Sequence, residues 1–208
     1  MRADERRARL GAARLYLCTA IRDDTFLNAA LGAGVDMIQL RDKDADAVSQ
    51  LRAAERFRAA ADRHGALFIF NDRADLAIAA NADGVHVGQE DLPPHAARAL
   101  VGPDMLIGRS THSDDELRRA HDEPVDYIGV GPVSATPTKP GRPGVGLALI
   151  RSAAAHATLP WFVTGGMDAH TIPSIKAEGA TRFVVVRAIT EADDAAEAVR
   201  AIRVAIDA

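Results

Sequence analysis

The segment "DMIQLRDKDADAVSQLRAAERFRAAADRHGALFIFND", residues 36–72, carries the pattern from which the fold is predicted. Two short apolar runs, "DMIQLR" and "LFIFND", flank an alanine-rich amphipathic segment, "DAVSQLRAAERFRAAADRH". Near-continuous apolar runs of four or five residues are typical of parallel strands that are buried on both faces. The segment is therefore predicted to form a strand, a helix and a second strand.

The same pattern recurs along the whole chain. Eight short apolar runs are separated by alanine-rich or amphipathic segments, and the runs are "RLYLCTA", "DMIQLR", "LFIFND", "DGVHVG", "MLIGRS", "DYIGVG", "WFVTGG" and "RFVVVR". This alternation predicts an α/β fold, a single (β/α)₈ TIM barrel, as the catalytic domain over residues 15–208, preceded by an N-terminal extension over residues 1–14. A doubly wound sheet is the alternative, but its usual glycine-rich turn is missing from "CTAIRDD" after the first run.

Composition excludes several classes of protein. The 208 residues are 48% hydrophobic, which is enough for one sizeable core, and the net charge of −4 comes without a polybasic tract for nucleic acid. No run approaches the ~20 apolar residues of a membrane span, and the N-terminus has no signal-peptide core. The single Cys18 excludes a disulfide framework and is typical of a small core residue. We expect a soluble, cytoplasmic protein whose oligomeric state the sequence leaves open.

The segment "ATPTKPGRPG", residues 135–144, has no apolar face and is predicted to be a loop. It offers hydroxyls and cations but no acid. That composition suits an anion, phosphate first, although a solvated loop is equally open on these residues alone.

In a barrel of this kind the active site lies at the carboxyl ends of the strands, so the residues after each apolar run are the candidates. Asp72 and Asp91 follow the third and fourth runs, and their carboxylates could converge. Mg²⁺ is commonly held by one or two carboxylates together with substrate phosphates. The alternative is that each aspartate caps the helix that follows it.

Two anion subsites are predicted at the same end of the barrel. Arg41 and Lys43 lie on one side of an extended segment and, with Ser110 and Lys139, could surround a diphosphate; a solvated charge pair is the alternative for "RDK". Gly165–Gly166 and Val186–Arg187 follow the seventh and eighth runs, where barrels often bind phosphate through backbone N–H groups.

The ordered set "QLRDK", "ND", "GQED", "GRSTH", "GPVSATPTK", "TGG" and "VVVRAI" resembles the thiamine-phosphate synthase (thiamine phosphate pyrophosphorylase) family, over nearly the whole chain after about residue 14. The resemblance implies a barrel transferase of thiamine biosynthesis that acts on two small phosphorylated substrates with Mg²⁺. It would join 4-amino-2-methyl-5-(diphosphomethyl)pyrimidine to 4-methyl-5-(2-phosphoethyl)thiazole. Pyrophosphate would dissociate first, and the thiazole nitrogen would trap the pyrimidine cation.

The resemblance also implies three groups of residues. The pyrimidine diphosphate would contact Gln39, Arg41, Lys43, Asn71, Ser110 and Lys139, of which Arg41, Lys43, Ser110 and Lys139 would be catalytic. Asp72 and Asp91 would be the Mg²⁺ ligands. The thiazole phosphate would contact Thr136, Pro137, Thr138, Gly166, Val186 and Arg187. Many family members have serine at the position of Arg187, and the role of this side chain is left open.

Two alternatives remain at this stage. A thiazole tautomerase-like isomerase on the same barrel would use His112, in "GRSTHS", as its acid/base residue. Such an isomerase needs no Mg²⁺, so the presence of both aspartates favours the synthase. A non-catalytic phosphate sensor on a degenerate barrel is the third interpretation.

His86 alternates with Val85 and Val87 and is interpreted as a core histidine that points into the barrel.

Overall fold

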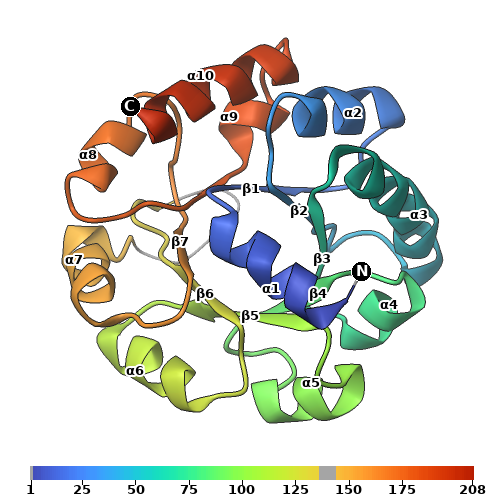
Figure 1. Ribbon diagram of the computed structural model, residues 1–208, viewed down its shortest axis with the longest axis horizontal. Coiled ribbons are helices and arrows are strands. Elements are labelled where there is room, and N and C mark those ends of the chain that lie inside the picture. Colours follow the sequence, from blue (N-terminus) through green and yellow to red (C-terminus); the bar gives the residue numbers. More distant parts are fainter. Residues whose placement is uncertain (1, 136–143) are drawn as a thin grey trace.

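A computed structural model, which describes residues 2–135 and 144–208, has eight parallel strands that close into a barrel in chain order (Figure 1). The predicted (β/α)₈ fold is confirmed, and a strand forms at each of the eight apolar runs, with β5 extending one residue beyond its run to Thr111. The strands are β1 (Leu15–Thr19), β2 (Met37–Leu40), β3 (Leu67–Asn71), β4 (Gly84–Val87), β5 (Leu106–Thr111), β6 (Tyr127–Val130), β7 (Trp161–Val163) and β8 (Phe183–Val185).

Helices surround the barrel in Figure 1; α2 to α8 lie between successive strands, and α9 and α10 follow the last strand. They are α2 (Asp24–Gly32), α3 (Ala47–His64), α4 (Ala74–Ala79), α5 (Pro94–Val101), α6 (Asp114–Asp122), α7 (Gly146–His156), α8 (Ile172–Lys176), α9 (Arg187–Thr190) and α10 (Ala195–Asp207). Local chemistry sets several boundaries. Asp46 and Ser113 accept hydrogen bonds from backbone N–H groups at the start of α3 and α6, and α3 ends at Gly65 in the left-handed conformation.

The inward side chains change from apolar to polar along the strands. Near the amino ends they form an inner core that contains Tyr16, Met37, Leu67, Ile69, Leu106, Tyr127 and Phe162. Toward the carboxyl ends the inward positions are polar and include Cys18, Gln39, Asn71 and Ser110. Strand side chains alternate between the two faces of the sheet, so every second residue points into the barrel. The interior is therefore packed with apolar side chains near the amino ends of the strands and lined by polar side chains near their carboxyl ends.

Helix α1 (Ala3–Ala12) forms most of the predicted extension and lies across the middle of the ring in Figure 1. Its buried Leu10, with Ala13, belongs to the inner core. Its arginines reach the amino ends of the strands: Arg6 pairs with Asp83 at 3.1 Å and Arg7 with Asp126 at 3.0 Å. The helix therefore closes the end of the barrel opposite the polar half. The division of the chain into an extension and a catalytic domain stays a prediction.

Three aspartates occupy equivalent places at this closed end. Asp36, Asp83 and Asp126 each stand directly before an even-numbered strand, and each accepts a hydrogen bond of 2.9 Å from a backbone N–H of the preceding strand. Each also pairs with at least one arginine. An aspartate directly before β2, β4 and β6 thus links each of these strands to the strand before it.

We expect Asp83→Asn to lower the free energy of unfolding by about 2–3 kcal/mol, since one partner of a buried ion pair is lost. Asp83 is almost fully buried, whereas its partners Arg6 and Arg58 keep 13% and 15% of their side chains exposed. This partial exposure reduces the expected loss of stability below that for a completely buried ion pair. Asp62→Asn is the matched control, because Asp62 pairs with the same Arg58 but is exposed. Urea unfolding measures both variants, and equal midpoints would contradict the prediction.

Over residues 2–135 and 144–208, no helix has both the length and the apolar character needed to cross a membrane.

Candidate active site

A cavity of about 510 Å³ opens at the carboxyl ends of the strands, and residues from all eight strands or the loops that follow them line it. Ten predicted site residues are among them: Gln39, Arg41, Lys43, Asn71, Asp72, Asp91, Ser110, Gly166, Val186 and Arg187. The other four, Thr136, Pro137, Thr138 and Lys139, lie outside the described residues. The structure therefore brings the ten residues together, while the individual roles stay predictions.

Asp72 and Asp91 form a carboxylate pair on one wall of the cavity. Asp72 follows β3 with a φ of 59°, a left-handed conformation that is uncommon outside glycine and that directs the chain sharply into α4. Asp91 Oδ2 accepts a hydrogen bond of 2.7 Å from the Gly88 N–H. A Cβ on residue 88 would lie 2.8 Å from the same oxygen, so glycine is needed for this contact.

The electrostatics of this pair are unusual. Burial raises the pKa of Asp72, the nearby Lys43 ammonium opposes this shift, and the adjacent Asp91 carboxylate adds to it. Lys43 Nζ lies 2.9 Å from Asp72 Oδ2. Within the described parts of the chain, no third His, Cys, Asp or Glu completes a metal cluster with them. The pair can hold a cation that takes its remaining ligands from substrate or water.

The alternative that these aspartates cap helices is wrong. Helix α4 begins after Arg73 and α5 after Pro93, and neither start has a side-chain capping hydrogen bond. The two carboxylates are therefore not engaged at the helix starts that follow them.

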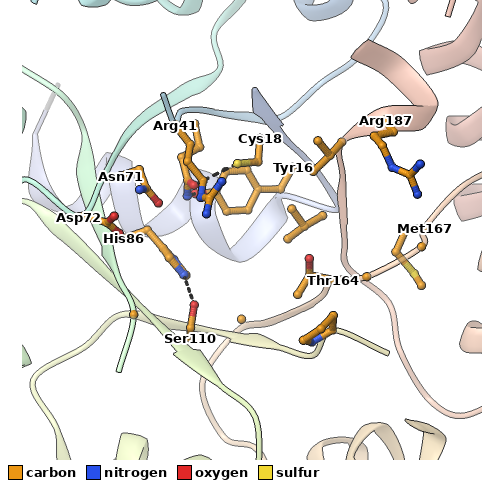
Figure 2. Close-up of a pocket in the computed structure, with 18 of the residues that line it drawn as sticks. Tyr16, Cys18, Arg41, Asn71, Asp72, His86, Ser110, Thr164, Met167 and Arg187 are labelled. Carbon is orange, nitrogen blue, oxygen red and sulfur yellow. Dashed lines mark hydrogen bonds between the residues drawn. The ribbon is translucent and has the colours of Figure 1, made fainter. Parts of the chain in front are cut away.

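A cationic wall lies next to the carboxylates. Arg41 extends into the cavity in Figure 2, and its guanidinium makes no hydrogen bond or ion pair with the described residues. Asp42, which follows it, accepts hydrogen bonds from the backbone N–H groups of Ile21 and Ala45 and so shapes the loop. "RDK" is therefore more than a solvated charge cluster, because its two cations line the cavity and its acid holds the turn.

Beneath these charges, hydrogen-bonded side chains from five strands form the floor. Figure 2 shows His86 directed at Ser110, and their Nε2 and Oγ atoms are 3.0 Å apart. The other ring nitrogen of His86 lies 3.2 Å from the hydroxyl of Tyr127. The strand alternation predicted that His86 points inward, but it did not predict this contact with Ser110. Tyr16 and Cys18 also line the cavity and were not among the predicted site residues.

The opposite wall is built from the ends of β7 and β8. Gly165 and Gly166 have φ values of 101° and 78°, which side chains rarely adopt, and a Cβ on Gly165 would meet Pro132 at 2.5 Å. These two glycines let the backbone make a tight turn at this wall of the cavity. Met167 and Arg187 lie on the same side of the cavity in Figure 2. The exposed guanidinium of Arg187 has no ion pair with any described residue.

His112, the residue of the tautomerase alternative, also lines the cavity. Its Nδ1 is hydrogen-bonded to the Gly131 carbonyl, and its backbone N–H donates to Glu116 at 2.7 Å. Glu116 thus anchors the residue before Ser113, the N-cap of α6. This geometry leaves His112 at the rim, with one ring nitrogen committed to the backbone.

Comparisons with known sequences give relatives of one kind. A family model described as thiamine monophosphate synthase matches residues 15–189. A thiamine-phosphate synthase from Thermobifida fusca is 56% identical over 196 residues, which cover 90% of this chain and 89% of the relative. One from Mycolicibacterium paratuberculosis is 52% identical over 201 residues, with coverage of 89% and 90%.

Solved structures agree with these relatives. A thiamine phosphate pyrophosphorylase from Pyrococcus furiosus superposes with a TM-score of 0.86 and 27% identity, covering 97% of each chain. A 3-hexulose-6-phosphate synthase reaches a TM-score of 0.67 at 21% identity, covering 93% of this chain and 99% of the other, and shows the shared barrel fold alone.

Proposed function

The chain belongs to the thiamine monophosphate synthase family, and we propose that it joins 4-amino-2-methyl-5-(diphosphomethyl)pyrimidine to 4-methyl-5-(2-phosphoethyl)thiazole. The relatives at 56% and 52% identity are named for this transferase activity, which supports the family resemblance found in the sequence. The observation that carries the proposal is a single cavity that holds a cationic wall, a carboxylate pair and a glycine turn. A biosynthetic role fits the cytoplasmic location, which stays a prediction.

Asp72 and Asp91 would hold Mg²⁺ in this proposal. Two adjacent carboxylates that burial and mutual repulsion disfavour as a doubly charged pair are suited to a cation. Mg²⁺ takes oxygen ligands, usually one or two carboxylates with substrate phosphates and waters. When bound, the ion would offset negative charge on the diphosphate.

Arg41, Lys43 and Ser110 would bind the diphosphate and stabilise it as it leaves. Charge on the pyrophosphate oxygens grows as the carbon–oxygen bond breaks, so fixed donors around them lower the barrier. The guanidinium of Arg41 offers a planar fork and the ammonium of Lys43 a point charge. Lys139 is proposed for the same role from the sequence, outside the described residues.

The pyrimidine would lie deeper in the barrel, where Gln39 and Asn71 offer amide groups. An electron-rich aminopyrimidine can carry the cation left by the departing pyrophosphate. The thiazole phosphate would bind at Gly166, Val186 and Arg187, together with Thr136, Pro137 and Thr138, so that the ring nitrogen meets the cation. Positioning of this kind replaces a nucleophilic side chain.

A coupling assay tests the proposal. Purified protein is mixed with both substrates, with Mg²⁺ or with EDTA, and thiamine phosphate and pyrophosphate are quantified together. Equal amounts of both products, lost in EDTA, are expected. Absence of product would reject the synthase and direct the next assay to the tautomerase alternative, with His112→Ala as its control.

We expect Arg187→Ser to raise the KM for the thiazole phosphate about three- to tenfold while kcat changes little, because an exposed charge-assisted contact is worth roughly 1 kcal/mol. Among the described residues the Arg187 guanidinium has no ion-pair partner, and it lines the same cavity as Gly165 and Gly166, which motivates this prediction. Steady-state kinetics measure it. Arg200→Ser is the control, since this exposed arginine on α10 removes the same charge away from the cavity. Equal KM values in wild type and Arg187→Ser would remove this side chain from the subsite.

A further inference from the structure

The floor of the cavity contains a continuous chain of hydrogen bonds. It begins at Cys18, whose thiol donates to Gln39 Oε1 at 3.2 Å. Gln39 Nε2 donates to the Tyr16 hydroxyl at 2.5 Å, and the hydroxyls of Tyr16 and Tyr127 are 3.1 Å apart. The members come from β1, β2 and β6, so the chain crosses the interior of the barrel.

The chain continues to the cavity through His86. The Tyr127 hydroxyl lies 3.2 Å from Nδ1 of this histidine, and Nε2 lies 3.0 Å from Ser110 Oγ. Ser110 is the last member and one of the predicted diphosphate ligands.

The direction of donation follows from the number of hydrogens. A phenol has one hydrogen to donate, and an amide nitrogen can only donate. Because Gln39 donates to Tyr16, the Tyr16 hydrogen is available for Tyr127, and the Tyr127 hydrogen for Nδ1 of His86. A nitrogen that accepts carries no hydrogen in neutral imidazole, so the hydrogen lies on Nε2.

Burial supports this order. Both phenols are fully enclosed, and burial raises the pKa of Tyr16 and Tyr127 well above the ordinary tyrosine value, so each keeps its hydrogen at neutral pH. The rings cannot easily turn. Tyr16 and Tyr127 pack edge to face at 6.1 Å, and the backbones of Gly108 and Gly129 lie close to the His86 ring.

We propose that this chain holds His86 as the Nε2–H tautomer, so that Ser110 accepts from His86 and presents its own hydrogen to the cavity. The leaving pyrophosphate is the acceptor of that hydrogen, a point that rests on the proposed function. In the opposite polarity Ser110 would donate to His86 and turn its lone pairs toward an anion. Tyr16, Tyr127 and His86 are thus positioning residues for one donor, without taking or giving a proton in the reaction.

Nitrogen-15 NMR of imidazole-labelled protein at neutral pH tests the tautomer directly, without substrate. The His86 signals are identified by their loss in His86→Gln. We expect a protonated Nε2 and an unprotonated Nδ1, and a weaker preference in Tyr127→Phe, where the donor to Nδ1 is gone. A protonated Nδ1 in the wild type, alone or with Nε2, would overturn the proposal.

Steady-state kinetics test whether the hydrogen bond donated by Ser110 assists the reaction. Ser110 donates most strongly to charge that develops in the transition state, so Tyr127→Phe is expected to lower kcat about tenfold and leave KM nearly unchanged. His86→Gln, whose amide can still donate to Ser110, is expected to retain more of kcat than His86→Ala. Unchanged kcat in both Tyr127→Phe and His86→Ala, with melting curves like that of the wild type, would refute the positioning role.

The two experiments also separate the proposals from each other. If the wild type makes no thiamine phosphate, the proposed function fails, and the NMR result alone decides the tautomer. If the wild type is active but His86 carries its hydrogen on Nδ1, the function stands and the directed chain is refuted.

Discussion

Replacing Gly108 with alanine is expected to lower the free energy of unfolding by about 3 kcal/mol or more, at the upper end of overpacking effects, and to reduce turnover at least ~100-fold. The new methyl group would lie 2.2 Å from Tyr127 Cζ and 2.4 Å from His86 Nδ1. Neither ring has room to retreat, because both are packed inside the barrel and Gly108 pairs with neighbouring strands on both sides. The floor of the cavity must therefore shift with the core.

The matched control for this substitution is Gly11→Ala, the same chemical change in helix α1. Apart from the adjoining residues and the backbone of α1 itself, no atom of the described residues lies within 4 Å of a Cβ placed on Gly11. Because glycine is a poor helix former, this variant should gain about 0.5–1 kcal/mol and keep full activity. Urea unfolding and the coupling assay measure both variants. A Gly108→Ala protein as stable and as active as the wild type would show that the rings can move, which would contradict the packing argument.

The fold was predictable from the sequence because the strands are short apolar runs. Segments such as "LFIFND" and "DYIGVG" are buried on both faces, and burial of that kind leaves a continuous signal in one sequence. The helix α1 was not predicted, since only Leu10 of that helix is buried and its contacts are arginines that reach distant aspartates. Such pairings depend on the closed barrel and leave no local pattern.

The rim of the site was predictable for a related reason. A barrel brings the carboxyl ends of all its strands together, so polar residues after the apolar runs were expected to meet, and Arg41, Asp72 and Asp91 do line one cavity. The floor was not predictable in the same way. Tyr16 and His86 lie within strands, where a single sequence does not distinguish a core residue from one that lines a cavity. Their contacts also require residues from non-adjacent strands.

Asp72→Asn is expected to lower turnover about 100-fold or more, the scale for one preorganised electrostatic group in an active site. Asparagine has nearly the same shape and tolerates the left-handed φ of 59° at this position, so the fold should remain intact. What is removed is a charge beside Asp91 and Lys43. Steady-state kinetics with increasing Mg²⁺ measure the loss, and activity should also require more Mg²⁺.

Without Mg²⁺ the same variant is expected to be more stable than the wild type at pH 7. Burial, with the Asp91 carboxylate, raises the pKa of Asp72 above its ordinary value, so the folded state binds more protons than the unfolded state between the two values. Wild-type stability therefore falls as pH rises through that window and stays lower above it. Asparagine does not titrate, so the advantage of the variant should shrink as pH is lowered into the carboxyl range.

Asp75→Asn, three residues after Asp72 in the first turn of α4, provides the control with the opposite sign. The hydrogen bond from Arg73 lowers the pKa of Asp75, whose carboxylate is exposed. The ionised Asp75 carboxylate stabilises the folded state above the pH range in which carboxyl groups ordinarily titrate, and this stabilisation is lost as pH falls. The Asp75→Asn variant should therefore be no more stable than the wild type at pH 7. Thermal melts in EDTA across pH compare the three proteins.

Adding Mg²⁺ then tests whether Asp72 is a metal ligand or only a buried carboxylate with a raised pKa. A cation that binds the folded state raises the melting temperature by mass action. Wild type and Asp75→Asn should both respond to Mg²⁺ with pyrophosphate present, and Asp72→Asn should not. If Asp72→Asn responds as strongly as the wild type, Asp72 is not a ligand, and its raised pKa reflects burial alone. If it neither gains stability in EDTA nor loses activity, the charge at this position has no role in the site.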